Sequence, residues 1–131
     1  MLEPSRELDA IASVAVDAAL EVHRVLGPGF LESTYEEAFA IELELRGIPF
    51  ERQKIVKVLH KGRQAGEGRL DFVVEGQLIV ELKAADSLLP IHQAQVLSYL
   101  KATGHQLGLL INFHESLLKH GIKRVVLTAP H

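Results

Sequence analysis

The sequence predicts one domain of the α/β (α+β) class, in the order helix, helix, three strands, helix, strand, strand. Apolar residues recur with a helical period over residues 5–26 and 31–47. Short runs rich in Val, Ile, Leu and Phe follow, and a third helical segment over residues 90–103 separates them from two further apolar runs. The 131 residues suffice for one hydrophobic core but not for two domains, so residues 1–131 are treated as a single unit.

Helix boundaries are marked by residues that start or stop helices. Ser5 suits the start of the first helix, and the Gly-Pro-Gly of residues 27–29 ends it. Gly47 suits the C-terminal cap of the second helix. Pro90 opens the third helix and Gly104 ends it.

The strand predictions rest on alternation and on apolar runs. Residues 51–59 alternate enough to form a strand, and residues 70–74 and 78–82 have the composition of an antiparallel hairpin. Residues 107–112 form a continuous apolar run, which suits a buried strand. Residues 113–121 are expected to form a loop with a short helical turn, and residues 122–128 a last strand.

The central hairpin places three charged residues on one face. Because side chains alternate along a strand, Asp71, Glu81 and Lys83 share a face, while Leu70 and Phe72 lie on the other. A three-residue turn over 75–77 sets Asp71 directly across from Glu81. A two-residue turn would set Asp71 opposite Val80 and split the group. We expect the three-residue turn.

Two carboxylates at cross-strand distance repel each other unless a cation lies between them. Mg²⁺ or Mn²⁺ suits such a pair, completed by a backbone carbonyl and waters. Lys83 could position the attacking water or stabilise charge on a phosphate. The alternative is an exposed sheet face on which Lys83 and Glu81 form an incidental ion pair.

Composition excludes several classes of function. The sequence has no cysteine, which excludes disulfides, thiolate zinc sites and a cysteine nucleophile. The acidic start lacks the apolar core of a secretory signal, and no run reaches the roughly 18 residues that a membrane span requires. A cytoplasmic location without a membrane partner is therefore expected.

Charge is divided unevenly along the chain. Residues 1–51 hold 11 acids and 3 bases (−8), whereas residues 52–131 hold 6 acids and 11 bases (+5). A nucleic-acid partner would approach the second part. The basic side chains around residues 52–69, which include Arg69, either bind backbone phosphates or protect an edge strand from aggregation.

Polar residues on two helices are further candidates. His92, Gln95 and Tyr99 share a face of the third helix, which could orient a phosphate or the Lys83 side chain, or could simply be solvated. Glu32 lies near the start of the second helix and Tyr35 on the same side. Glu32 there is either catalytic or a partner of the helix dipole.

The element order and the Asp…Glu-x-Lys pattern on neighbouring strands resemble the PD-(D/E)XK nuclease superfamily. A more specific likeness, carried by Gly29, Glu32 and Tyr35 and by segments through residue 113, is to the GxxExxY proteins. The resemblance implies a restriction-endonuclease-like core, a mixed central sheet flanked by helices. Leu70 replaces the Pro that classically precedes the Asp.

The resemblance also implies roles for individual residues. Asp71, Glu81 and the carbonyl of Leu82 would hold the metal, Glu32 would be the helix carboxylate that reaches the metal or its water, and Lys83 would be the catalytic lysine. Gln95 and Tyr99 match the Q-x3-Y motif of the RecB-like branch. The expected catalytic residues are Lys83, Glu32, Asp71 and Glu81. The expected metal ligands are Asp71, Glu81, Leu82 and Glu32. The expected substrate-binding residues are Gln95, Tyr99, His92, Tyr35 and Arg69.

The functional prediction is a Mg²⁺-dependent (or Mn²⁺-dependent) nuclease that hydrolyses phosphodiester bonds of nucleic acid, most simply DNA. One alternative is a catalytically inactive nuclease-like module for nucleic-acid binding or protein assembly. Another is a structural domain in which the charged residues form only an ion-pair network. Nucleic acid is the expected partner, and a homodimer is a further prediction.

Overall fold

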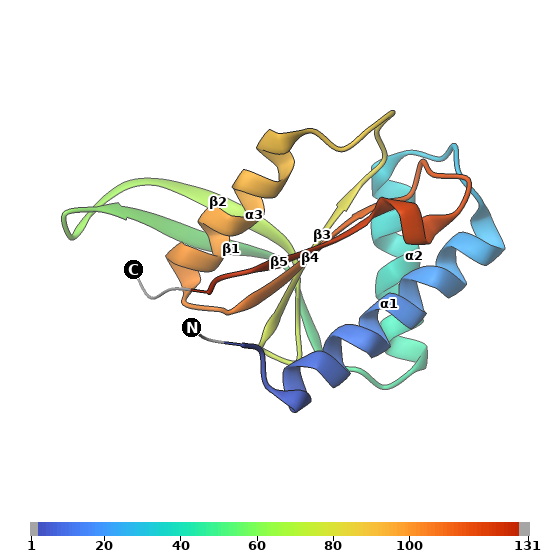
Figure 1. Ribbon diagram of the computed structural model, residues 1–131, viewed down its shortest axis with the longest axis horizontal. Coiled ribbons are helices and arrows are strands. Elements are labelled where there is room, and N and C mark those ends of the chain that lie inside the picture. Colours follow the sequence, from blue (N-terminus) through green and yellow to red (C-terminus); the bar gives the residue numbers. More distant parts are fainter. Residues whose placement is uncertain (1–2, 129–131) are drawn as a thin grey trace.

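The computed structural model describes residues 3–128, which form a five-stranded sheet with helices on both faces (Figure 1). The predicted order of helices and strands is confirmed. The elements are α1 (Arg6–Leu26), α2 (Glu32–Leu45), β1 (Phe50–His60), β2 (Arg63–Val74), β3 (Leu78–Lys83), α3 (Pro90–Thr103), β4 (Leu107–Asn112), the 3₁₀ turn η1 (Leu118–Gly121) and β5 (Ile122–Val126).

The strands lie in the order β1-β2-β3-β4-β5. Strands β1 to β3 form an antiparallel meander, and β5 is antiparallel to β4. The pairing of β3 with β4 is parallel, and α3 provides the crossover that a parallel connection needs. The sheet is therefore mixed, as the resemblance implied.

Strand β2 begins at Arg63, well before the predicted start at residue 70. Its first part, residues 63–69, consists of polar residues, glycines and one alanine and is solvent-exposed at most positions, so it lacks the apolar signal that marks a strand in the sequence. It is a strand because it pairs with β1 as far as His60↔Arg63. A two-residue loop, Lys61 (φ 51°) and Gly62 (φ 79°), closes this ribbon, as the right-handed twist of a hairpin favours.

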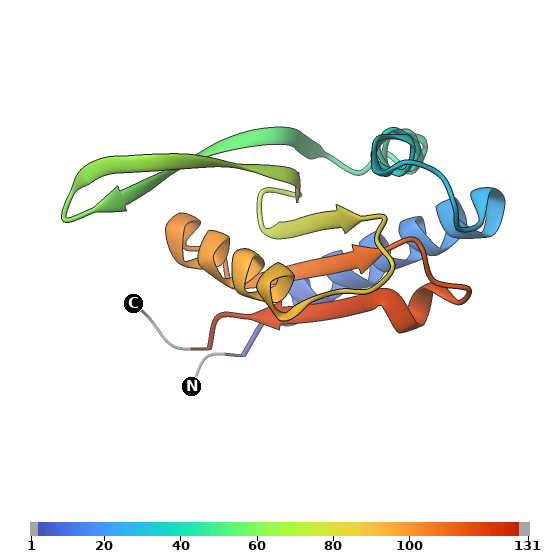
Figure 2. The same ribbon diagram turned by 90° about the horizontal axis from the view of Figure 1, so that it is seen from above.

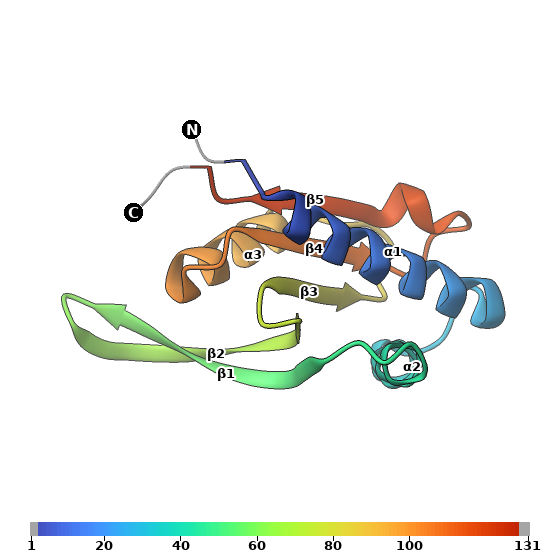
Figure 3. The same cartoon turned by 90° about the horizontal axis from the view of Figure 1, so that it is seen from below.

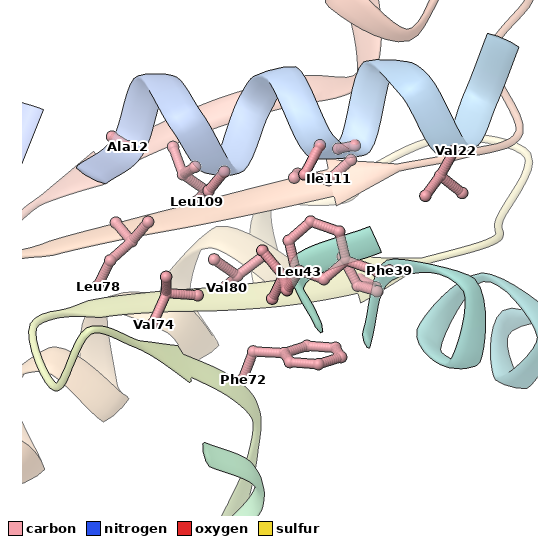
Figure 4. Packing of buried hydrophobic residues seen from close by; sticks show 14 of the residues in the cluster. Ala12, Val22, Phe39, Leu43, Phe72, Val74, Leu78, Val80, Leu109 and Ile111 are labelled. Atoms are coloured by element: carbon pink, nitrogen blue, oxygen red, sulfur yellow. The ribbon is translucent and has the colours of Figure 1, made fainter. Parts of the chain in front are cut away.

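The main core lies between the sheet and the helices α1 and α2. Helix α1 packs along the sheet through a stripe of small and aliphatic residues, and α2 lies beside the start of β1 (Figure 3). Phe39 meets Phe72 edge to face at 4.9 Å between ring centroids. Figure 4 shows further residues of this cluster from α1, α2 and the strands, including Ala12, Val22, Leu43, Val74, Leu78, Val80, Leu109 and Ile111.

Helix α3 covers the opposite face of the sheet, where Leu100 packs with Val73 and Ile79. Gly108 of β4 lets the helix approach closely, because a Cβ there would lie 2.7 Å from Val96 Cγ1. Leu70 also belongs to this cluster, so its predicted place beside Phe72 is wrong. The ribbon changes face between residues 70 and 72, where the β1–β2 ladder is interrupted.

The ends of helix α1 lie at the residues that the sequence predicted as its start and stop signals. The Ser5 side chain accepts a hydrogen bond from the Leu8 amide at 3.1 Å, and Gly27 (φ 68°) ends α1 in the left-handed region that favours glycine. Within residues 3–128, no helix combines the length and apolar character needed to cross a bilayer.

Candidate active site

The candidate site lies where β2 and β3 separate. Their ladder pairs Phe72↔Val80 and Val74↔Leu78 and stops there, while β3 continues alongside β4 to Lys83. The three-residue turn over 75–77 is confirmed by this register. Asp71 and Glu81 are therefore the next residues after the last paired rung. We call this separation of the two strands the fork.

Side chains replace the backbone ladder at the fork. Asp71 Oδ2 accepts a hydrogen bond from the Leu82 amide at 2.8 Å, and Glu81 Oε1 accepts one from the Asp71 amide at 3.1 Å. The Glu81 carboxylate is thus held by the backbone of Asp71, and the Asp71 carboxylate is held by the backbone of Leu82, the residue after Glu81. One oxygen of each, Asp71 Oδ1 and Glu81 Oε2, is left without a backbone donor among the described residues.

The backbone conformation of Gln53 explains why the Asp71 amide can donate to Glu81 instead of to β1. The β1–β2 ladder pairs Arg52↔Phe72 and Lys54↔Leu70 but omits Gln53 and Asp71 between them. Gln53 has a φ of 52°, in the left-handed region that side chains other than glycine rarely adopt. Such local strain persists only where surrounding contacts enforce it. It turns the backbone so that Asp71 reaches β3 rather than completing the β1 ladder.

Glu81 carries the strongest electrostatic perturbation of the site. Its side chain is buried, with a residue exposure of 5%. Burial first, and then the nearby Asp71 charge, raise the pKa of Glu81 from 4.5 to about 9, while the positive charge of Lys83 opposes this rise. With its pKa raised this far, Glu81 keeps its proton at neutral pH. Burial of Glu81 rules out the alternative of an exposed sheet face.

Lys83 and Leu82 extend the site along β3. Lys83 is half-buried, and no salt bridge among residues 3–128 joins it to Asp71 or Glu81, so the incidental ion pair is absent there. The N–H and C=O of one strand residue point to the same side. Because the Leu82 amide points at Asp71, the Leu82 carbonyl is directed toward the fork as well.

A buried asparagine supports the end of β3. Asn112 pairs with Lys83 in the parallel ladder and is fully buried. Its side chain accepts from the Ala85 amide at 3.0 Å and donates to the Ala85 carbonyl at 2.9 Å. These two bonds fix the chain just after Lys83. The sequence signal for Asn112 is a single polar residue that ends an apolar run.

Helix α2 brings Glu36, not Glu32, to the fork. Gln53 Nε2 donates to Glu36 Oε1 at 2.5 Å and lies 3.5 Å from Asp71 Oδ1, so it bridges the two acids. Arg52 also binds Glu36, with an N–O distance of 2.9 Å. Glu32, the predicted helix carboxylate, is exposed at the first turn, and its side chain makes no hydrogen bond within residues 3–128. Sequence analysis missed Glu36 and Gln53.

Helix α3 lies beside the segment of β2 that leads to Asp71. Tyr99 packs on Gly68, where a Cβ would lie 2.6 Å from the ring, and Gln95 Nε2 donates to the Tyr99 hydroxyl at 3.4 Å. The predicted pair is thus gathered near β2. His92 accepts from the Leu89 amide through Nδ1 at 3.0 Å and caps the helix start. Arg69 is exposed on β2.

Tyr35, predicted as a substrate-binding residue, lies in the core of the protein. It is fully buried and stacks on Phe113 with ring centroids 4.5 Å apart. Its hydroxyl donates to the Gly27 carbonyl at 2.5 Å and accepts from the Phe30 amide at 3.1 Å. These bonds tie the turn after α1 to α2 and leave no surface of Tyr35 for a substrate.

The residues at the fork fit a hard divalent cation. Two carboxylates and a main-chain carbonyl are the oxygen ligands that Mg²⁺ prefers, with waters completing the coordination. Burial and the nearby Asp71 charge raise the pKa of Glu81, so a cation bound between the two carboxylates would favour their ionised forms. Among residues 3–128 no group of three acidic or histidine side chains is assembled, so the predicted trio with Glu32 is not gathered.

Comparison with known proteins identifies the family of this chain. Comparison with curated proteins gives no match. A solved structure titled "Crystal structure of SSO0001" is similar with a TM-score of 0.46 and 16% sequence identity, over 89% of this chain and 66% of that one. This chain thus spans just under two thirds of that protein. A family model described as the PD-(D/E)XK nuclease superfamily matches residues 9–125, nearly the whole chain. The chain therefore belongs to the PD-(D/E)XK nuclease superfamily.

Proposed function

We propose that the protein is a metal-dependent nuclease that hydrolyses phosphodiester bonds of DNA, with Mg²⁺ or Mn²⁺ as its cofactor. The observation that carries this proposal is the fork, where Asp71 and Glu81 meet at the end of the β2–β3 ladder and Lys83 follows Glu81 by two residues on β3. The high pKa of Glu81 supports a site designed for a cation, because the buried pair is costly to ionise without one.

Asp71, Glu81 and the Leu82 carbonyl would hold the metal. The two backbone hydrogen bonds orient the carboxylates and leave Asp71 Oδ1 and Glu81 Oε2 for the cation. When bound, Mg²⁺ would stabilise the negative charge that builds on the scissile phosphate. The buried setting of Glu81 strengthens such electrostatic stabilisation, since little water competes there.

Lys83 would position the attacking water. It follows Glu81 by two residues, and both side chains leave β3 on the α3 face, opposite to the buried Val80 and Leu82. An ammonium group there can hold a water through its hydrogen bonds and place charge near the phosphate. The bonds that Asn112 makes with Ala85 keep this end of β3 in place.

Two acids of α2 are candidates for the helix carboxylate. Glu32 follows from the sequence pattern, whereas Glu36 is connected to Asp71 through Gln53. We propose that Glu36 fills this role by orienting the water or a ligand of the cation. Glu36→Gln is then expected to lower kcat more than tenfold and Glu32→Gln less than threefold, in the range of single general acid or base contributions. The reverse order would return the role to Glu32.

Substrate contacts would come from the surfaces beside the fork. Arg69 lies on β2 two residues before Asp71, and Gln95 and Tyr99 lie over the same strand. These donors can bind the phosphates that flank the cleaved bond. His92 lies in the first turn of α3 and already caps the helix, so its contact with substrate would require a change in that hydrogen bond.

Cleavage of labelled linear and circular DNA with Mg²⁺ or Mn²⁺ tests the proposal. The wild-type protein should cleave, and Asp71→Asn and Lys83→Met should each lose activity by at least a hundredfold while remaining folded. Lys119→Met, at an exposed lysine of η1 that is not one of the fork residues, is the matched control. Absence of cleavage by the wild-type protein with every metal and substrate would favour the inactive binding or assembly module instead.

A further inference from the structure

Beyond the fork, β1 and β2 pair only with each other and leave the body of the protein as a two-stranded ribbon (Figures 1 and 2). We call residues 54–69 the arm. It reaches from Lys54↔Leu70 to the tip at His60↔Arg63, with a small register shift between Val58 and Leu59. From Asp71 to Arg63 the strand has eight steps, or roughly 25 Å at about 3.3 Å per residue.

Positive charge is concentrated in the arm. It holds five bases and one acid, Glu67, for a net charge of +4, whereas the whole chain has −3, so the remaining residues sum to −7. Its bases are exposed, and Lys54 is the only one of them that forms a salt bridge within residues 3–128. The other four are Lys57, Lys61, Arg63 and Arg69. A polyanion would find its complementary surface here.

The base of the arm is anchored, so its direction relative to the fork is defined. Val56 of β1 is buried against Leu70 and Leu100. Gly68 of β2 lies directly under the ring of Tyr99, with space for no Cβ. Helix α3 thus holds the arm on the side of the sheet to which Glu81 points. The arm therefore continues directly from the fork along β1 and β2.

We propose that the arm binds duplex DNA by lying along its major groove, on one side of the cleaved phosphodiester bond. This inference rests on the proposed function. The major groove of B-DNA, about 12 Å wide, admits a two-stranded ribbon, whereas the deep and narrow groove of duplex RNA does not. The arm spans about seven base pairs, and its bases contact the phosphates on both walls of the groove. Exposed Ile55 and Leu59 contact sugars and thymine methyl groups.

Duplex affinity without catalysis provides the first test. Binding of a 30-base-pair DNA is measured in EDTA for the wild type and for Lys57→Gln/Lys61→Gln/Arg63→Gln. The control, Lys101→Gln/Lys119→Gln/Lys123→Gln, has the same change in charge at exposed positions outside the arm. Loss of three phosphate contacts should make the slope of log K against log salt concentration shallower by about 2.7, since each contributes about 0.9. The control should keep the wild-type slope.

Cleavage provides the second test and separates this inference from the proposed function. The arm variant should lose at least tenfold in kcat/KM on the 30-base-pair DNA but keep the wild-type rate on bis(4-nitrophenyl) phosphate, which is too small to reach the arm. If the wild type hydrolyses neither substrate, the proposed function fails, and the binding experiment still decides the role of the arm.

Four results would overturn the inference. One is an arm variant with the affinity and salt slope of the wild type, and another is an equal loss in the control variant. A third is equal binding of duplex DNA, single-stranded DNA and duplex RNA by the wild type. The last is a loss of dimers in the arm variant without loss of DNA affinity, which would make the arm an interface between copies of this chain.

Discussion

Glu81→Gln should make the protein more stable in the absence of metal while it removes a proposed metal ligand. Burial and Asp71 raise the pKa of Glu81 from 4.5 to about 9. Between pH 4.5 and about pH 9, Glu81 therefore keeps its proton in the folded state and loses it in the unfolded chain. The free energy of unfolding falls as pH rises through that window. Below pH 4.5 both states are protonated and the effect is fully absent.

The size of the effect follows from the same shift. At pH 7 Glu81 stays protonated in the folded state but is ionised in the unfolded chain. This difference lowers the free energy of unfolding by about 3 kcal/mol, at roughly 1.4 kcal/mol for each pH unit above 4.5. Gln is neutral in both states and avoids this cost. For a chain of this length the variant should melt roughly 10 °C higher than the wild type. The burial of Glu81 leaves little solvent to screen the effect.

Thermal unfolding in EDTA between pH 5 and pH 9 measures this difference. The gap between Glu81→Gln and the wild type should widen steadily with pH, because only the wild type has the buried acid. Glu44→Gln, at an exposed position of α2, is the control and should follow the wild type. A variant that melts below the wild type at pH 8, or a gap independent of pH, would refute the electrostatic account of the fork.

Three further predictions concern the site and its supports. Saturating Mg²⁺ at about 100 times its Kd should stabilise the wild type by about 2.7 kcal/mol in thermal unfolding and leave Asp71→Asn unchanged; equal stabilisation of both would place the cation elsewhere. Gly68→Ala should lose about 1 to 3 kcal/mol in denaturant unfolding because its Cβ overlaps Tyr99, whereas Gly66→Ala, with no atom within 4 Å, should lose less; equal losses would contradict the close packing. Tyr35→Phe should lose about 1 to 3 kcal/mol of stability and leave KM unchanged, since its hydroxyl bonds only the backbone; a raised KM with unchanged stability would restore its role in substrate binding.

Most of the fold could be predicted because its signals are local. The glycines and prolines at helix ends and the apolar runs of β3 and β4 each identify an element without reference to the rest of the chain. The turn length over 75–77 then determined the register that brings Asp71 to Glu81. The outer half of β2 was missed because an exposed ribbon has no buried face and hence no apolar alternation.

The site was less predictable because it depends on contacts between distant segments. The helical period of α2 shows which residues share a face but not which turn of the helix meets the sheet, so Glu36 was overlooked beside Glu32. Nothing in the local sequence marks the positive φ of Gln53. Tyr35 was predicted as a substrate contact from its place beside Gly29 and Glu32 in the motif, and the sequence alone did not show that it is fully buried. The narrower resemblance to the GxxExxY proteins stays a prediction.

The most direct test of the central claim is to locate a cation in the folded protein. Crystals soaked in Mn²⁺ should give an anomalous scattering peak at the fork, about 2.0 to 2.3 Å from a carboxylate oxygen of Asp71, one of Glu81 and the carbonyl oxygen of Leu82. Such a peak, absent from crystals of Glu81→Gln, would establish the fork as a metal centre. A wild-type crystal with no peak between these oxygens, or with the only peak elsewhere, would contradict the account.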